Sequence, residues 1–403
     1  MSRIRIKNFG PIKEGNTENN GWIDIKKVTV FIGNQGSGKS TVAKLISTFS
    51  WIEKAIYRGD LDKSLSRQEI EEFISFQRIQ HYLKPDTLIE YEGDMLKISF
   101  SSNITPHFEK QNKKNPLVPQ IIYIPAERNF LSTIKNPYAI KGLPDTLQSF
   151  AIEYKNSQLK YANRMISLPI GDVKYKYNEG NDTSLLYGKD YELSLIEAAS
   201  GYQSFVPMYM VTGFLIDQIV NKTEKLDVNQ EVRKAKEKDK ILNDSSLTND
   251  EKMNIVKDID SKYINSFLLN IVEEPELNLF PVSQWEMLKS LLSYNNQIKE
   301  NTLIITTHSP YIINYLTLTI EANNLKKKIN TQQLQDKLNK IVPSNVTFEA
   351  KDLVIYELNE RTGKIKRLHD YNGLPSDENY LNQNLAHTND LFSQLLDIED
   401  LCQ

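Results

Sequence analysis

The sequence predicts an α/β fold in which helices flank a mixed sheet, with an antiparallel β-subdomain and helical insertions. Apolar runs at 28–32, 267–272 and 303–306 have the length of buried strands, and each is followed by polar residues. The first run leads through a glycine-rich loop into a helical pattern. Alternating runs at 87–101 indicate an antiparallel hairpin, and the charged stretch at 222–262 has the spacing of paired helices.

The loop after the first strand follows the pattern G-x-x-x-x-G-K-S. Glycines let the backbone turn its N–H groups toward anionic oxygens, and the new helix presents its positive end there. In this pattern Lys39 reaches the β- and γ-phosphates of a nucleotide, and the Ser40 hydroxyl is a ligand of Mg²⁺. A chance glycine-rich turn would not explain the strand and helix on either side. The predicted nucleotide-binding residues are Gly33, Asn34, Gln35, Gly36, Ser37, Gly38, Lys39, Ser40 and Thr41.

Two adjacent carboxylates end the second apolar strand, in the sequence Glu273-Glu274-Pro275-Glu276. Side chains alternate along a strand, so one carboxylate can serve a metal ion while the next faces the γ-phosphate. We assign Glu273 to Mg²⁺, directly or through water, and Glu274 to polarising the attacking water. Pro275 ends the strand. The alternative is an acidic surface loop, which the apolar strand directly before the pair disfavours.

Two weaker signals lie elsewhere in the chain. His308 follows the third apolar strand, within the sequence T-H-S-P, and can contact a γ-phosphate oxygen, although a lone histidine is more often structural. Ser200 and Gly201, followed by Gln203, open an apolar helical stretch that runs to about Val220. A Ser-Gly pair at this place can offer a hydroxyl and free N–H groups to a phosphate, but taken alone it is a common helix N-cap.

The four elements in this order resemble the head of an ABC-type ATPase. More narrowly, the chain resembles the SMC/RecF/OLD branch, where the second motif commonly reads Glu-Glu-Pro-Glu and the histidine sits in Thr-His-Ser-Pro. The pattern over residues 4–12 also resembles the first strand of that branch. The resemblance implies that Glu274 and His308 are catalytic. It also implies a signature that acts on ATP held by another protomer, made of Ser200, Gly201 and Gln203.

Among relatives of this size, the chain most resembles the ATPase subunit of the PARIS anti-phage defence system, with the Septu and Gabija ATPases as close competitors. That resemblance implies ATP and Mg²⁺ as cofactors and a homo-oligomer, at least a dimer and up to a hexamer. It further implies a separate effector, a Toprim-type nuclease, released when a phage trigger protein is sensed. The sequence over 346–403 shows no carboxylate cluster of a Toprim nuclease, so we expect the effector to be another chain.

Some residues depart from the family pattern. Tyr202 stands where the signature usually has glycine, which affects how closely another protomer can approach. Glu273 stands where many ABC enzymes have aspartate, and its longer side chain can shift the metal geometry. The glutamine loop of the family has no clear counterpart. The strand-like run at 121–124 ends in polar residues, among them Arg128, which either contacts nucleotide or a neighbouring chain or forms a structural salt bridge.

Composition narrows the class of protein. The chain has 403 residues and a formal net charge of −3, so it has no global basic footprint for nucleic acid, while a local basic patch stays open. Its one cysteine, Cys402, excludes an internal disulfide and fits a reducing, cytoplasmic location. The N-terminus begins with an alternating strand pattern and not with a signal peptide. The most apolar stretch, 205–220, contains Pro207 and Asp217 and is expected to be a core helix and not a membrane span.

We expect an ATPase head over 1–345, with inserts at 60–120 and 222–262, and a C-terminal hairpin and helix over 346–403. The insert at 222–262 is interpreted as a helical hairpin, either an arm for a partner or another copy, or a solvated excursion. We also expect a helix of about four turns that begins at a capping box at 66–69. A helix over 145–165, an antiparallel meander over 173–195 and a terminal helix over 389–401 are expected as well.

Two other functions remain open from the sequence. A RecF- or SMC-like DNA-repair ATPase would have a basic groove at its dimer surface and DNA-stimulated hydrolysis, and the net charge leans against it. The detached ATPase subunit of a transporter would co-purify with a membrane subunit, and the Glu-Glu-Pro-Glu and Thr-His-Ser-Pro motifs argue against it. A neighbouring gene for a Toprim nuclease, an HNH nuclease or a permease would each select a different function.

Overall fold

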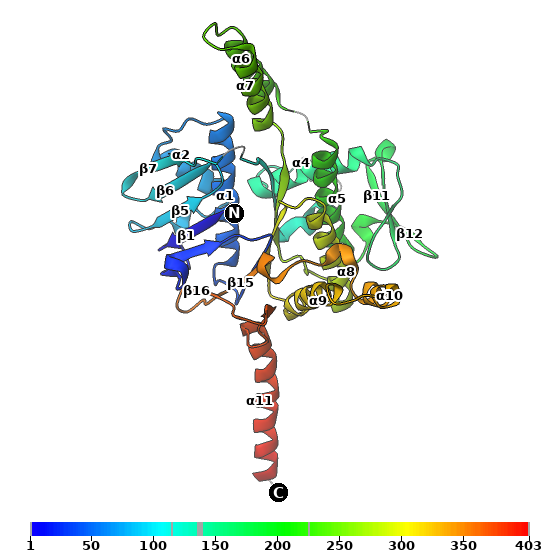
Figure 1. Ribbon diagram of the computed structural model, residues 1–403. Helices are drawn as coiled ribbons and strands as arrows, with labels where there is room; N and C mark the ends of the chain where they lie inside the picture. The colour runs from blue at the N-terminus through cyan, green and yellow to red at the C-terminus, as the bar shows by residue number, and fades with distance from the viewer. Residues whose placement is uncertain (1, 114–115, 135–139, 225, 402–403) are drawn as a thin grey trace.

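The computed structural model describes residues 2–113, 116–134, 140–224 and 226–401, so Cys402 lies outside the described residues. Its centre is a sheet in the order β2-β16-β15-β4-β14-β13-β8 (Figure 1). Neighbours from β15 to β8 run parallel, whereas β16 is antiparallel to β15, and the predicted mixed sheet is confirmed. The strands are β2 (Gly15–Asn16), β4 (Val28–Gly33), β8 (Pro119–Ile124), β13 (Phe267–Glu273), β14 (Thr302–Thr307), β15 (Leu353–Leu358) and β16 (Lys364–Arg367).

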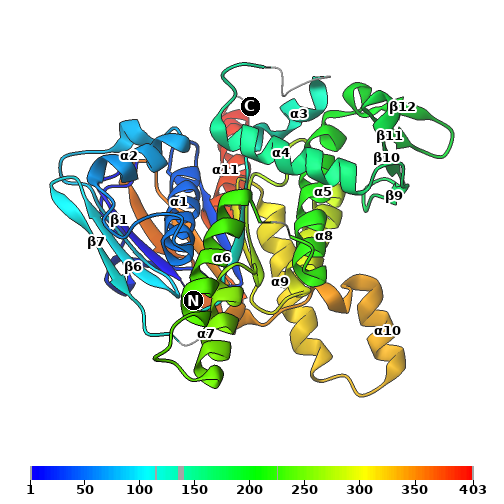
Figure 2. The same cartoon turned by 90° about the horizontal axis from the view of Figure 1, so that it is seen from above.

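Side chains of the central strands alternate between two apolar cores, one on each face of the sheet. Ile271 and Ile304 belong to the core that includes α1, whereas Val272 and Ile305 belong to the core that includes α5, α8 and α9. Figure 2 shows α1 on one side of the sheet and the other three helices on the opposite side. Because the parallel strands share one direction, their carboxyl ends meet at one edge of the sheet. These helices are α1 (Lys39–Arg58), α5 (Ser200–Asn221), α8 (Pro281–Asn296) and α9 (Pro310–Lys326).

The predicted antiparallel β-subdomain is a second sheet, in the order β3-β1-β5-β6-β7, whose apolar face shares a core with α1. The strand β7 was not predicted, because its Pro106 argues against a strand; it lies at the sheet edge, where a missing N–H is tolerated. The predicted capping box of Ser66 and Glu69 opens α2, which is shorter than the four turns expected. The bounds are β1 (Arg3–Lys7), β3 (Trp22–Asp24), β5 (Leu88–Glu92), β6 (Leu96–Ser101), β7 (Ile104–Lys110) and α2 (Arg67–Phe76).

A buried carboxylate joins α1 to this sheet. Glu53 of α1 is 3% exposed, and its Oε1 accepts hydrogen bonds from the backbone N–H groups of Met95 (2.7 Å) and Leu96 (2.9 Å). Its Oε2 accepts a hydrogen bond from the Tyr91 hydroxyl at 3.0 Å. Burial raises the pKa of Glu53 to about 7, although the three hydrogen bonds act in the opposite direction. The charged form is therefore disfavoured in the folded state.

We expect Glu53→Gln to remove a pH-dependent loss of stability. The folded chain keeps a proton on Glu53 that the unfolded chain releases above its lower pKa, so the stabilisation is complete below about pH 4.5 and is lost as the pH rises through about 7. A shift of this size corresponds to about 3 kcal/mol of unfolding free energy. Thermal melting between pH 5 and pH 8 should show wild type losing stability relative to Glu53→Gln. The exposed Glu72→Gln is the control, and equal pH profiles for wild type and Glu53→Gln would contradict the expectation.

The other side of the sheet carries a lobe built from α5, α4 and a small antiparallel sheet in the order β12-β11-β10-β9, which confirms the predicted meander. The helix predicted over 145–165 ends at Lys160, and Asn163 then adopts a left-handed φ of 62°. The bounds are α3 (Phe130–Thr133), α4 (Asp145–Lys160), β9 (Ile166–Ser167), β10 (Lys174–Asn178), β11 (Thr183–Tyr187) and β12 (Glu192–Ser194).

The predicted helical hairpin is formed by α6 (Val228–Leu242) and α7 (Asn249–Lys262), which project from the body as an arm (Figure 1). No residue of α6 is fully buried, and ion pairs connect the two helices. Asp260 pairs with Lys234 at 2.8 Å and with Lys238 at 2.7 Å, and Lys262 pairs with Glu237 at 3.3 Å.

The C-terminal segment is continuous with the central sheet. Its strand β15 lies beside β4, the strand that leads into the glycine-rich loop, so the sheet extends across the boundary expected at 345/346. The terminal helix α11 begins at Tyr380, earlier than predicted, and extends away from the body (Figure 1). No helix of the described residues is long and apolar enough to cross a membrane. The remaining elements are α10 (Gln332–Ile341), β17 (Asp370–Tyr371), β18 (Leu374–Pro375) and α11 (Tyr380–Leu401).

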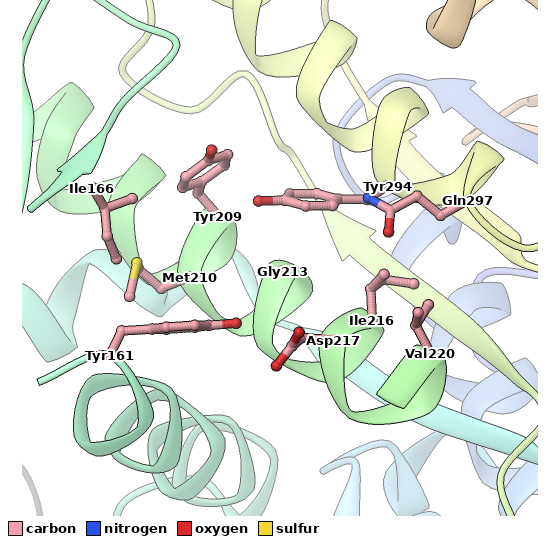
Figure 3. Close-up of a pocket in the computed structure, with 10 residues that line it drawn as sticks. All are labelled: Tyr161, Ile166, Tyr209, Met210, Gly213, Ile216, Asp217, Val220, Tyr294 and Gln297. Carbon is pink, nitrogen blue, oxygen red and sulfur yellow. The ribbon is translucent and has the colours of Figure 1, made fainter. Parts of the chain in front are cut away.

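A cavity of about 310 Å³ opens beside the C-terminal half of α5 (Figure 3). Three tyrosines, Tyr161, Tyr209 and Tyr294, line it, together with Asp217. The absence of a side chain at Gly213 makes room for Tyr294, since a Cβ there would lie 2.7 Å from the Tyr294 hydroxyl. Because the helix rises about 1.5 Å per residue, this cavity lies about 20 Å from the N-terminal end of α5, where the predicted signature residues lie.

Candidate nucleotide site

The glycine-rich loop connects β4 to α1, as the sequence predicts. Gly38, directly before α1, has a φ of 103°, and a Cβ there would lie 3.1 Å from the Pro11 ring, so a larger residue is disfavoured twice over. Lys39 is 5% exposed, and its ammonium donates hydrogen bonds to the carbonyls of Gly33 (2.9 Å) and Asn34 (3.0 Å). The lysine therefore lies folded within the loop that is predicted to hold phosphate.

The charge of Lys39 is balanced by the carboxylates at the neighbouring strand ends. Burial lowers the pKa of Lys39 to about 8, and the negative charges of Glu274, Glu276 and Glu273 oppose this shift. The ammonium is thus mostly protonated at neutral pH. A polyanion placed in the loop would stabilise the charged form further.

Glu273 is the last residue of β13 and is 5% exposed. Its Oε2 accepts a hydrogen bond from the N–H of Ala126 at 3.3 Å. Its Oε1 is buried and forms no hydrogen bond of ordinary geometry among the described residues, with the buried Tyr123 hydroxyl near the carboxylate. A buried carboxylate oxygen without such a hydrogen bond fits a role toward Mg²⁺, directly or through water. The described residues hold no group of three or more acidic, histidine or cysteine side chains able to bind a metal alone, so Ser40, phosphate oxygens and water would complete the shell.

Glu274 and His308, predicted as the catalytic pair, lie next to each other. The Glu274 Oε1 is 3.5 Å from the His308 Nε2, and both side chains are 34% exposed. Burial and the neighbouring Glu273 raise the pKa of Glu274, while Lys39 and Arg128 oppose the rise. Burial and the charge of Lys39 lower the pKa of His308, which favours the neutral imidazole.

The backbone of Glu274 is unusual, with a φ of 41° in the left-handed region. A glutamate in this region is uncommon and needs support from its surroundings. Its N–H donates to the carbonyl of Thr306 at 2.8 Å, and its carbonyl accepts from the N–H of Leu277 at 3.0 Å. This support fixes where the carboxylate points.

Glu276 has a role that the sequence analysis did not assign. Its Oε1 accepts hydrogen bonds from the Thr307 hydroxyl (2.7 Å) and the His308 N–H (2.9 Å), so it ties the carboxylate motif to the histidine. Its Oε2 is buried without a partner among the described residues, and burial raises the pKa of this carboxyl. In the sequence, only its place as the third acidic residue of Glu-Glu-Pro-Glu could have indicated this role.

The predicted signature residues differ in their exposure to solvent. Ser200 is the first residue of α5 and is exposed, so it can reach another molecule. Gln203 is buried and donates to the carbonyl of Ile196 at 2.9 Å, within its own chain. A Cβ on Gly201 would lie 2.9 Å from the carbonyl oxygen of Asn278, and the Tyr202 hydroxyl is directed at Gly171. The bulk of Tyr202 is therefore directed into its own chain.

Arg128 is fully buried and is in no salt bridge among the residues that the structure describes, which corrects both alternatives left open by the sequence. Its side chain is fully buried and donates hydrogen bonds to backbone carbonyls. Its position in the sequence, after a strand that ends in polar residues, gave no signal that its partners would be carbonyls.

No protein-family model matches the chain, and no curated protein matches its sequence. Among solved structures, it is similar to the SMC head domain from Thermotoga maritima at 10% identity, covering 78% of this chain and 90% of that chain with a TM-score of 0.33. The Smc head domain derived from Pyrococcus furiosus gives 10% identity, coverages of 91% and 96%, and a TM-score of 0.37. The ATP-binding cassette MJ0796, in a dimeric structure bound to ADP and Pi, is 10% identical to this chain. The match covers 92% of this chain and 100% of that chain, with a TM-score of 0.30.

The predicted α/β fold class is confirmed. A glycine-rich loop follows the central parallel strand β4. The paired carboxylates lie at the carboxyl end of β13, and His308 follows β14, the strand between β4 and β13.

Proposed function

We propose that this chain binds and hydrolyses Mg²⁺-ATP as an ABC-type ATPase head. The observation that carries the proposal is the convergence of Lys39, Glu274 and His308 at the carboxyl ends of three neighbouring parallel strands, β4, β13 and β14. A strand-loop-helix that presents N–H groups and a lysine is suited to phosphates. A carboxylate beside a neutral histidine is suited to orienting a water molecule and contacting the γ-phosphate.

Each residue has a distinct part in this proposal. Lys39 compensates the negative charge of the β- and γ-phosphates, and its ammonium has a third N–H beyond the two that donate to the carbonyls of Gly33 and Asn34. Glu274 orients the attacking water and receives its proton, and its raised pKa suits that exchange. His308 donates to an oxygen of the γ-phosphate. Mg²⁺, held through Ser40 and Glu273, would neutralise the charge that develops between the phosphates.

We further propose that the site is completed by a second copy of the chain. Ser200 is exposed at the N-terminal end of a helix of 22 residues, where free N–H groups and the helix dipole attract an anion. Among the described residues, no hydrogen bond or ion pair joins Ser200 to the P-loop of its own chain. In the family that the motifs resemble, this end of the helix closes on ATP held by the partner.

A complementation experiment tests the shared site. Ser200→Glu places a carboxylate where the partner's γ-phosphate would lie, and a glutamate in the first turn favours the helix. We expect Ser200→Glu and Lys39→Ala each to be inactive, and co-expression of the two to restore part of the hydrolysis, because some interfaces then pair an intact loop with an intact helix end. Ser245→Glu, at an exposed position in the turn between α6 and α7, is the matched control.

The result that contradicts a shared site is an absence of recovery in a confirmed mixed oligomer of two folded variants. The ATPase proposal would survive that result, with a site that is complete within one chain. Ser200 is a better position for the test than Gly201, because a side chain on Gly201 would collide with the carbonyl of Asn278 in its own chain.

The wider role is supported by the motif resemblance alone. On that basis we propose a homo-oligomer that controls a separate effector, a Toprim-type nuclease, in anti-phage defence. Co-expression with the product of the neighbouring gene tests this role. A Toprim nuclease that co-purifies in an ATP-dependent way supports it, whereas a permease or a DNA-stimulated ATPase activity selects one of the other functions.

A further inference from the structure

The side chain of Arg128 connects two parts of the site that lie far apart in the sequence. It is 0% exposed. Its Nε donates to the carbonyl of Ser204 at 3.0 Å, and its Nη1 donates to the carbonyls of Pro125 (3.1 Å) and Glu273 (2.7 Å). Its Nη2 donates to the carbonyl of Glu274 at 2.7 Å. One guanidinium group therefore joins the N-terminal part of α5 to the carboxylate motif at the end of β13.

The same segment holds α5 at a second point. Pro207 lies inside α5 and has no N–H, so the carbonyl of Gln203 loses its usual partner in the helix. The hydroxyl of Ser132 donates to that carbonyl at 2.9 Å instead. Arg128 and Ser132 thus contact consecutive carbonyls, those of Gln203 and Ser204, in the turn that begins with the exposed end of the helix. The start of α5 is fixed to the segment that follows β8.

At its other end, Arg128 contacts a residue whose backbone lies in the left-handed region. Glu274 has a φ of 41°, and Arg128 holds its carbonyl while Thr306 holds its N–H. The carboxylate of Glu274 is the one next to His308. The carbonyl that Arg128 holds and the carboxylate belong to the same residue, so a displacement of the Glu274 backbone at this carbonyl would move the carboxylate relative to Lys39 and the γ-phosphate.

We propose that Arg128 is a positioning residue that couples the two half-sites of one chain, and this inference rests on the proposed function. The signature end of α5, at Ser200, engages ATP held by the partner, whereas Glu274 acts on ATP held by its own chain. When α5 shifts against the partner's nucleotide, the bond to Ser204 carries Arg128 with it. The carbonyls of Glu273 and Glu274 follow, so each site responds to engagement at the other.

The chemistry of the side chain suits this role. A guanidinium offers five N–H donors in a fixed plane, so displacement at one carbonyl is passed to the others. An ammonium has three donors on a flexible stem and cannot span the same carbonyls. Burial lowers the pKa of Arg128 to about 10, with Glu276, Glu273 and Glu274 opposing the shift, so the group stays charged at neutral pH.

Arg128→Lys tests the coupling, with Ser132→Ala as the matched control. Both variants loosen the start of α5, but Ser132→Ala leaves the bonds to Glu273 and Glu274 in place. ATP affinity, kcat and the Hill coefficient for ATP are measured on the full-length oligomer. We expect wild type to hydrolyse ATP with a Hill coefficient above 1. Arg128→Lys should bind ATP with near wild-type affinity, lose cooperativity, and show a kcat lower by about 10- to 100-fold.

Ser132→Ala should melt at a lower temperature and keep both kcat and cooperativity. Equal loss of cooperativity in the two variants would show a general loosening of the segment and would overturn the coupling. Hydrolysis by wild type with a Hill coefficient near 1 would overturn it as well. Absence of any wild-type hydrolysis contradicts the ATPase proposal first, and the coupling falls with it.

A second measurement applies if Arg128→Lys does not fold. Isotope-labelled Lys39→Ala chains are mixed with unlabelled Ser200→Glu chains, so that the labelled chain has an intact signature and an empty site of its own. Coupling predicts that ATP slows amide exchange at the end of β13, over residues 268–274, in the labelled chain. Unchanged exchange in those peptides, in a mixture that hydrolyses ATP, would overturn the coupling and leave the shared site intact.

Discussion

Lys39→Ala is expected to abolish ATP hydrolysis and to weaken ATP binding. The ammonium is the cation of the proposed phosphate loop, and it lies near three carboxylates whose negative charge opposes an anionic ligand. Without Lys39, the β- and γ-phosphates would meet these carboxylates uncompensated. Loss of one preorganised contact to developing charge costs about 10²–10³-fold in rate, and this contact also serves binding. Hydrolysis is measured by phosphate release and binding by titration calorimetry.

The control for this prediction is Lys44→Ala, which removes a partly exposed lysine from the same helix. It should leave binding and turnover unchanged, so any loss in Lys39→Ala is specific to the loop. Circular dichroism and a thermal melt establish that both variants are folded. Wild-type turnover in a pure Lys39→Ala preparation would contradict the nucleotide site assignment.

Glu274→Gln should bind ATP and Mg²⁺ and yet hydrolyse ATP about 10²–10⁴-fold more slowly, the usual cost of losing a general base. Glutamine is close in shape to glutamate, so the left-handed backbone and its hydrogen bonds to Thr306 and Arg128 are retained. The variant loses the ability to accept a proton and keeps the geometry. Single-turnover hydrolysis, measured beside ATP affinity, separates the chemical step from binding.

Glu273→Gln is the matched comparison, because it removes the neighbouring carboxylate, which has a different part. Glu273 has a buried oxygen that forms no hydrogen bond of ordinary geometry among the described residues and lies against the N–H of Ala126, so its loss should raise the Mg²⁺ concentration needed for half-maximal activity. If Glu274→Gln hydrolyses ATP normally, or if Glu273→Gln leaves the Mg²⁺ titration unmoved, the roles assigned to the two residues are wrong.

The P-loop, the carboxylate pair and the histidine could be placed from sequence because each is local. An apolar run fixes the strand, and the residues directly after it must lie at the strand's carboxyl end. Whether the strands are neighbours is a different question. The order β4-β14-β13 places the histidine strand between the other two, and no local pattern records that order.

The parts that sequence could not supply depend on contacts between distant segments. Arg128 looks like any charged residue after a strand, and its burial follows from carbonyls at positions 204, 273 and 274 that fold around it. Glu276 gains its part by meeting Thr307 and His308 across the sheet edge. Pro106 hides β7, because a proline is tolerated in a strand when that strand lies at an edge.

The arm formed by α6 and α7 is attached where the end of α1 meets the segment before β13. At the far end of α1, the Arg58 guanidinium donates to the carbonyl of Lys262 in α7 (2.9 Å) and to the side chain of Asn265 (2.8 Å), just before β13. The helix that starts in the phosphate loop and the strand that ends in the carboxylates thus share one anchor. A force applied to the arm would therefore act on α1 and β13 together. A protein bound to the arm would therefore displace the loop and the carboxylates from a distance of about 30 Å, the length of α1.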